Sequence, residues 1–327
     1  MDKRERLHAT LRGEAVDRVA VALWRHFPVD DQRPEDLAAA TLEFQSLYDF
    51  DLVKVSPTSS FCLKDWGAED AWHGNPEGTR DYTRRVIQRP EDWAKLKPLD
   101  PHLGHLAAQL HALDLIGAGL AGRTPFIQTV FSPLSQARNL VGPDVFPVHL
   151  RQHPEALKAG LDVIAESTLR FVEAAKRAHP DGIFYAVQFA STRVFSEPEY
   201  REFGEPLDRK ILQAAGDLWL NVAHLHGNDV MFDLVASYGA AVVNWHDQET
   251  PPSLAQGLKH FRGAVCGGLR QWETMVRGTP EQVQAEARAA LAETGGRRFI
   301  LGTGCVTPTA APRANLRAAR DVVEARP

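Results

Sequence analysis

The feature that most constrains the fold of this chain is an alternation of short apolar runs with longer amphipathic segments, repeated eight times. Runs rich in valine, isoleucine and phenylalanine, each followed by helical periodicity, are typical of βα units around a parallel sheet. Eight such units in about 300 residues fit a closed (β/α)8 TIM barrel better than an open doubly wound sheet, which usually has fewer strands. The expected strands are Val19 to Trp24, Asp51 to Ser56, Pro125 to Val130, Gly182 to Gln188, Leu218 to His224, Ala241 to Trp245, Gly263 to Gly267 and Arg298 to Gly302.

The segments between these runs carry helix signals, such as a proline at the start or apolar residues at helical spacing. Helices are expected at Pro34 to Phe50, Glu155 to Ala178, Glu281 to Glu293 and Pro312 to Ala325. The stretch Pro57 to Leu103 breaks the alternation and predicts a β-hairpin excursion from a barrel loop, because it is neither low in complexity nor rich in Gly and Ser. With no visible boundary, residues 1–327 are expected to form a single α/β domain.

Charge and cysteine content exclude several classes of protein. A net charge of -5 over 327 residues argues against a nucleic-acid binder, which normally carries a basic stripe. The chain lacks the run of about 18 consecutive apolar residues that a membrane span requires. Its three cysteines do not form a disulfide framework of the secreted type and are read as thiols. The sequence therefore predicts a cytoplasmic protein that binds neither membranes nor nucleic acid.

Polar residues gather where the expected strands end, which is where (β/α)8 barrels carry their catalytic groups. Arg25 and Gln188 are the candidate contacts for a small-molecule substrate, and the guanidinium of Arg25 suits a carboxylate, although a surface salt bridge explains it equally well. His246 and Asp247 are the candidate catalytic pair, as a proton relay or as a partner that orients a metal ligand. A polar pair that closes a surface turn is an equal alternative.

The sharpest combination is His224 and His226 with Cys305, at two strand ends that a closed barrel brings to the same rim. Residues i and i+2 of a strand share a face, so both imidazoles can point inwards. Two imidazoles, one thiolate and an open fourth position form a usual catalytic zinc site. The alternative remains that the histidine spacing is fortuitous and that Cys305 is a small buried hydrophobe. Cys266, inside an apolar run, favours a packed core thiol over a further ligand.

Several short blocks follow one another along the chain: Thr124-Pro125-Phe126, Ser132-Pro133-Leu134, Asp181-Gly182-Ile183, Ser196-Glu197-Pro198, Gly267-Gly268-Leu269 and the closing Gly302-Thr303-Gly304-Cys305 with Thr307-Pro308 and Asn315-Leu316. In this order, the blocks resemble the uroporphyrinogen decarboxylase superfamily. The resemblance covers nearly the whole chain and implies a (β/α)8 barrel, in agreement with the independent strand pattern.

The chain departs from true uroporphyrinogen decarboxylases at the residues that surround the porphyrin in that family. Arg25 matches the first of the family's arginines, but the second is absent. The positions of the family's aspartate, tyrosine, serine and late histidine hold Pro57, Asn139, Ala190 and Thr303. These replacements would leave the carboxylates of a highly anionic porphyrinogen poorly paired. Decarboxylation of uroporphyrinogen is therefore disfavoured.

A second branch of the superfamily, the zinc-dependent methyltransferases that act between corrinoid proteins and thiols, carries His-x-Cys and a later Gly-Cys. His224, His226 and Cys305 fall on these positions, with histidine in place of the first cysteine. The resemblance implies one Zn²⁺ per chain, methyl transfer to a substrate thiol from a corrinoid or other carrier, a corrinoid protein as partner, and a homodimer. Two alternatives stay open: a metal-independent decarboxylase of a tetrapyrrole or smaller acid, with Arg25 and Asp247 as anchors, and a ligand-binding barrel without catalysis.

Overall fold

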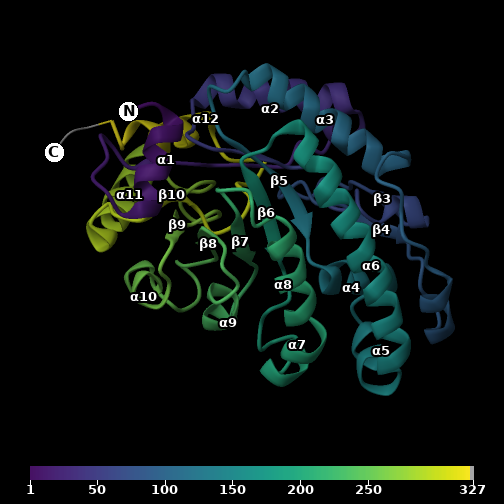
Figure 1. Cartoon of the computed structure of the whole chain (residues 1–327). Helices are drawn as coiled ribbons and strands as arrows, with labels where there is room; N and C mark the ends of the chain where they lie inside the picture. The colour runs from purple at the N-terminus through teal and green to yellow at the C-terminus, as the bar shows by residue number, and fades with distance from the viewer. Residues whose placement is uncertain (325–327) are drawn as a thin grey trace.

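The computed structural model describes residues 1–324 and contains an eight-stranded parallel sheet (Figure 1). Each predicted apolar run contributes one strand, and the strands follow the order β1-β10-β9-β8-β7-β6-β5-β2. The two end strands meet where the Asp51 N–H, just before β2, donates to the Val21 carbonyl of β1 at 2.9 Å. The predicted (β/α)8 barrel is therefore confirmed. Its strands are β1 (Ala20–Val21), β2 (Val53–Val55), β5 (Phe126–Phe131), β6 (Gly182–Val187), β7 (Val222–Leu225), β8 (Val242–Asn244), β9 (Ala264–Leu269) and β10 (Phe299–Thr303).

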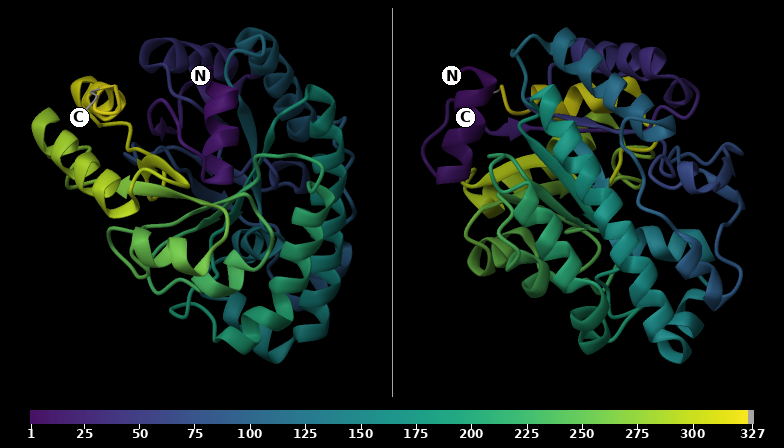
Figure 2. Two further views of the ribbon diagram at one scale, coloured as in Figure 1. Left: turned by 60° about the vertical axis from the view of Figure 1, so that its left-hand side comes forward. Right: turned by 45° about the vertical axis from the view of Figure 1, so that its right-hand side comes forward.

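Helices lie outside the strands, with α11 and α12 on one side and α6 and α8 on the other (Figure 2, left). The helix expected to reach Phe50 ends at Tyr48, because Asp49 adopts a left-handed backbone conformation with φ 54°. The expected last helix is shorter than predicted, and Ala325 lies outside the described residues. The helices are α1 (Lys3–Arg12), α2 (Pro34–Tyr48), α3 (Gly104–Leu120), α4 (Pro133–Val141), α5 (Phe146–Gln152), α6 (Pro154–Ala175), α7 (Glu197–Phe203), α8 (Glu205–Ala214), α9 (Phe232–Ala236), α10 (Leu254–His260), α11 (Pro280–Thr294) and α12 (Arg313–Asp321).

The strand expected from Leu218 begins only at Val222. The Asn221 side chain explains the difference, since its amide nitrogen donates to the carbonyls of Ala215 at 2.7 Å and Leu218 at 3.1 Å. These bonds hold the preceding residues in a turn, which cannot pair with a neighbouring strand.

The predicted hairpin excursion between the second and third barrel strands is confirmed. Strands β3 (Glu69–Ala71) and β4 (Asp81–Arg84) pair antiparallel in a separate two-stranded sheet. The tip between them, residues 72–80, extends over loops at the carboxyl ends of the barrel strands, as the contacts described below show.

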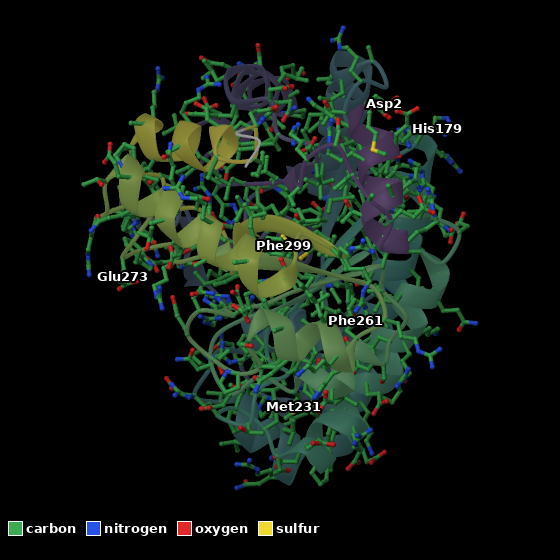
Figure 3. All side chains as sticks on the ribbon, turned by 90° about the vertical axis from the view of Figure 1, so that its left-hand side faces the viewer. Asp2, His179, Met231, Phe261, Glu273 and Phe299 are labelled. Atoms are coloured by element: carbon green, nitrogen blue, oxygen red, sulfur yellow. The ribbon has the colours of Figure 1, made fainter. Side chains whose placement is uncertain are left out.

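Helix α1 covers the opposite, amino-terminal end of the barrel. Arg6 of this helix and Arg18, just before β1, each form an ion pair with the fully buried Asp51, with N to O distances of 2.7 Å. Phe299 of β10, which is fully buried, is labelled near the middle of the view in Figure 3, and Glu273 is labelled at its edge. Within the described residues, no helix combines the length and apolar character needed to cross a bilayer. Charged pairs fill the amino-terminal end of the barrel. Active sites of (β/α)8 barrels lie at the carboxyl ends of the strands, so a functional site is expected there.

Candidate metal centre

Three side chains from two separate strands converge at the carboxyl end of the barrel. His224 lies in β7, His226 directly follows it, and Cys305 lies just beyond β10. The Cys305 sulfur is 3.7 Å from His224 Nε2 and 3.5 Å from His226 Nδ1. The candidate ligand atoms of all three residues lie within 4.8 Å of one another. The structure thus brings together the three residues that the sequence singles out as ligands.

These distances match the edges of a tetrahedral zinc site. With Zn–N of about 2.05 Å and Zn–S of about 2.3 Å, a tetrahedral angle separates the nitrogen and sulfur atoms by about 3.6 Å. Two imidazole nitrogens and one thiolate sulfur are also donors that zinc favours. The cluster of His224, His226 and Cys305, called the His/Cys cluster below, therefore fits one zinc ion and leaves a fourth position for another ligand.

Asn244 of β8 fixes the tautomer of His224. Its amide nitrogen donates to the carbonyls of Cys266 at 2.9 Å and Thr303 at 3.0 Å, so its Oδ1 is the atom that faces His224 Nδ1, at 2.7 Å. The proton of His224 therefore sits on Nδ1, and the Nε2 lone pair points towards Cys305. Metal-ligating histidines are commonly oriented by such a second partner. Asn244 was not identified from the sequence, although it is the last residue of β8 and precedes His246 by two positions.

Burial keeps both imidazoles of the cluster neutral. The pKa of His224 lies well below its usual value, chiefly because of burial and then because of the neighbouring His226 and His246. Burial also lowers the pKa of His226, while the charges of Glu77 and Glu249 act in the opposite direction. Since neutral imidazole is the form that binds a metal, the cluster is ready for ligation near neutral pH.

His246 lies at the edge of the cluster. Its ring centre is 5.1 Å from that of His226 and 6.4 Å from that of His224. Its Nδ1 is 3.5 Å from a Glu249 carboxylate oxygen, whereas its Nε2 is buried and has no hydrogen-bond partner among the described residues. A buried nitrogen without a partner suits a group that exchanges a proton with a bound molecule. The catalytic role of His246 stays a prediction.

Asp247 has different surroundings. Both of its carboxylate oxygens accept from the Gly268 N–H at 3.1 Å, and one also accepts from the Gln248 amide at 2.8 Å. The glycine at position 267 leaves room for this carboxylate, because a Cβ there would approach Asp247 Oδ1 to 2.1 Å. Burial raises the pKa of Asp247 to about 7. These contacts tie Asp247 to the end of β9, and its catalytic role stays a prediction.

The structure does not bring Arg25 to the cluster. Its guanidinium carbon lies 5.2 Å from the ring centre of Phe27 and 5.8 Å from that of Phe44, a residue of α2. The preceding residue, Trp24, packs against Phe184 of β6. Because neighbouring residues of an extended chain face opposite sides, Arg25 lies on the helix side of the sheet. Its role as a substrate contact stays a prediction that these contacts do not support.

Gln188 is better placed. It follows β6 and is half-buried. Phe184, four residues earlier, stacks on His224 with ring centres 5.1 Å apart. Gln188 therefore lies one residue beyond the end of a strand whose Phe184 contacts the His/Cys cluster. Binding of substrate by Gln188 stays a prediction.

The other two thiols lie outside the cluster. Cys266 of β9 is 2% exposed and belongs to the hydrophobic core. Burial, followed by the charge of Asp247, raises its pKa and keeps it protonated. Burial also raises the pKa of Cys62, in the excursion after β2, to about 12. Neither thiol therefore competes with Cys305 as a ligand of the cluster.

Lys54 of β2 is a second residue that the sequence analysis missed. Its ammonium is buried, donates to Ser56 Oγ at 3.0 Å and lies 4.6 Å from the ring centre of Phe184. Burial lowers the pKa of Lys54 to about 7, although the charge of Cys305 acts in the opposite direction. A lysine between the two valines of a barrel strand is the signal that could have identified it.

The hairpin tip is held against the loops that follow β9 and β10. The Pro76 carbonyl accepts from the Thr309 N–H at 2.6 Å and from its hydroxyl at 2.9 Å. One Glu77 carboxylate oxygen accepts from the Gln271 amide at 3.0 Å and the Trp272 indole at 3.1 Å. The tip is thus fastened across the carboxyl end of the barrel, next to the His/Cys cluster.

Two curated proteins are similar to this chain in sequence. The chain is 25% identical over 315 residues to methylated-thiol–coenzyme M methyltransferase of Methanosarcina mazei, covering 91% of this chain and 78% of the relative. It is 27% identical over 205 residues to uroporphyrinogen decarboxylase of Syntrophotalea carbinolica, covering 60% of this chain and 58% of that protein.

Solved structures agree in fold. A methyltransferase from Methanosarcina mazei superposes with a TM-score of 0.87 at 21% identity, covering 99% of this chain and 100% of that one. A B12-independent methionine synthase from Shewanella sp. W3-18-1, in complex with selenomethionine, gives a TM-score of 0.60 at 13% identity, with 94% of both chains covered. At these identities the likeness establishes the shared fold alone.

A family match covers nearly the whole chain. Residues 2–326 match the family described as uroporphyrinogen decarboxylase (URO-D), so the match extends over nearly the whole chain. The resemblance seen in the sequence blocks is confirmed, and both curated relatives are enzymes. The chain belongs to the uroporphyrinogen decarboxylase family and is an enzyme.

Proposed function

We propose that this chain is a zinc-dependent methyltransferase that moves a methyl group from a corrinoid, or another methylated carrier, to a small-molecule thiol. The observation that carries the proposal is the His/Cys cluster, whose sulfur-to-nitrogen distances of 3.5 and 3.7 Å are close to the edge of a zinc tetrahedron. The relative from Methanosarcina mazei named methylated-thiol–coenzyme M methyltransferase supports the same class of reaction. A corrinoid protein as partner and a homodimer belong to the proposal.

Zinc in this position would lower the pKa of a substrate thiol and so supply the thiolate nucleophile near neutral pH. The residues of the chain hold and surround that centre. Asn244 keeps the Nε2 lone pair of His224 directed at the cluster. His246, with its buried and unpaired Nε2, is the group proposed to take the thiol proton. Asp247 is proposed to hold the end of β9 in place.

The alternative of metal-independent decarboxylation with Arg25 and Asp247 as anchors has less support. The Arg25 guanidinium packs on Phe27 and Phe44 at the helix side of the sheet. The Asp247 carboxylate is already engaged by the Gly268 N–H. The position of Arg25 and the existing bond of Asp247 therefore both speak against pairing with an acidic substrate at the mouth of the barrel.

Methyl transfer can be measured directly. Zinc-loaded protein is incubated with methylcobalamin and a panel of small thiols, and the thioether products are quantified by mass spectrometry. We expect methylation of at least one thiol, its loss in Cys305→Ala, and its retention in Cys62→Ala, which removes a thiol outside the cluster. An absence of thioether together with conversion of uroporphyrinogen to coproporphyrinogen would favour the decarboxylase instead.

A further inference from the structure

Lys54 lies inside the barrel and has no carboxylate partner among the described residues. Its neighbours Val53 and Val55 pack into a cluster with residues of α3, on the helix side of the sheet. The alternation of side chains along β2 therefore directs Lys54 inwards, where it is 6% exposed. Among the described residues, no carboxylate forms an ion pair with its ammonium, and the Ser56 hydroxyl is its one hydrogen-bond partner.

The ammonium is close to the His/Cys cluster. The ring of Phe184 connects the two sites, because it stacks on His224 with centres 5.1 Å apart and has Lys54 Nζ 4.6 Å from its own centre. The bond to Ser56, two residues further along β2, shows that the Lys54 side chain extends towards the carboxyl end of the barrel.

A buried ammonium that pairs with no carboxylate is costly. It has three N–H donors, of which Ser56 takes one and the face of Phe184 offers a further, weaker interaction. A neutral side chain of similar length would fill this position without that desolvation cost. The cost is offset when an anion binds beside the ammonium, since charge-assisted hydrogen bonds are the stronger ones.

We infer that Lys54 binds an acid group of the substrate, so that the thiol accepted by this site is a thiol acid, with a carboxylate or similar oxyanion on the molecule that carries the sulfur. This inference rests on the proposed function. It assigns to Lys54 the substrate-anchoring role that the sequence gives to Arg25, which the structure places on the helix side of the sheet.

The test compares two small thiols that differ in charge. Binding of 3-mercaptopropionate and of the neutral 3-mercapto-1-propanol to the zinc-loaded full chain is measured by calorimetry. We expect the acid to bind about tenfold tighter or more, as a charge-assisted hydrogen bond provides. Lys54→Met should remove this preference by lowering the affinity for 3-mercaptopropionate alone, and Lys54→Arg should keep the preference. Lys95→Met, a change at an exposed lysine, should leave both affinities unaltered.

The outcomes separate this inference from the proposed function. Equal affinity for the two thiols in the parent protein, or a preference that survives in Lys54→Met, would overturn the role of Lys54 and leave thiol binding intact. Binding of neither thiol would contradict the proposed function and this inference with it. Removal of a buried charge should not lower the melting temperature of Lys54→Met, and the comparison in the parent protein requires no variant.

Discussion

At the scale of single residues, the account depends on Asn244. Replacing it with alanine removes the acceptor of the His224 Nδ1 proton, and the imidazole becomes free to rotate or change tautomer. We expect Asn244→Ala to weaken zinc binding roughly 10- to 100-fold, measured by competition with a chromophoric chelator. Asn221→Ala is the matched control, because Asn221 is also a buried asparagine with several hydrogen bonds but does not contact the cluster. Equal zinc affinities in the two variants would contradict the role of Asn244.

The three ligand candidates could be found from the sequence because their chemistry is unusual and their positions follow strand ends. The residues that surround the cluster could not be found in this way. Asn244 acts through a bond to the adjacent strand, and the position of Lys54 beside His224 depends on Phe184 from a third strand. Arg25 shows what a residue type at a strand end cannot tell: the side on which its side chain lies depends on the alternation of the chain, which directs Arg25 towards Phe27 and Phe44.

At the scale of elements, the hairpin tip is the segment whose position most affects access to the cluster. Loss of the Glu77 carboxylate removes its bonds to Gln271 and Trp272, while the Pro76 carbonyl keeps its bond to Thr309 and Arg80 keeps its ion pair with Asp31 at the other end of the tip. We expect Glu77→Ala to lower the free energy of local opening by about 1–2 kcal/mol. Hydrogen exchange of residues 74–78 and of the Thr309 amide would then accelerate.

The matched control for the hairpin is Glu69→Ala, which removes a solvent-exposed ion pair with Arg84 at the base of the same hairpin. Such surface pairs contribute little, so exchange at the tip should stay at the parent rate. Tip exchange that is unchanged in Glu77→Ala, or equally fast in both variants, would show that the contacts with Gln271 and Trp272 do not hold the tip down.

Helices and strands could be predicted from the sequence where a single physical effect determines their position. The barrel strands are buried on both faces, and this gives apolar runs that are visible in the sequence. The ends of the strands were less predictable, because side chains such as Asn221 form hydrogen bonds with backbone carbonyls in place of strand pairing. The start of β7 is thereby shifted to Val222. The excursion was recognisable as a hairpin, but the docking of its tip depends on loops nearly 200 residues later in the chain.

At the scale of the whole molecule, closure of the barrel creates the candidate metal centre. Strands β7 and β10 are separated by β8 and β9 in the sheet, and its curvature brings Cys305 to within 3.7 Å of His224 Nε2. The centre could therefore be predicted once eight βα units were recognised. The charged residues around α1 at the opposite end of the barrel contribute to closing it and leave the carboxyl end for the site.

The most direct measurement of the central claim is the zinc content of protein purified without chelator, determined by elemental mass spectrometry. We expect close to one zinc per chain in the parent protein and in Cys62→Ala. Cys305→Ala should lose most of its zinc, because removal of the thiolate leaves only the imidazoles of His224 and His226 as ligands. A zinc content near zero in the parent protein, or an unchanged content in Cys305→Ala, would contradict the assignment of the His/Cys cluster as a metal centre.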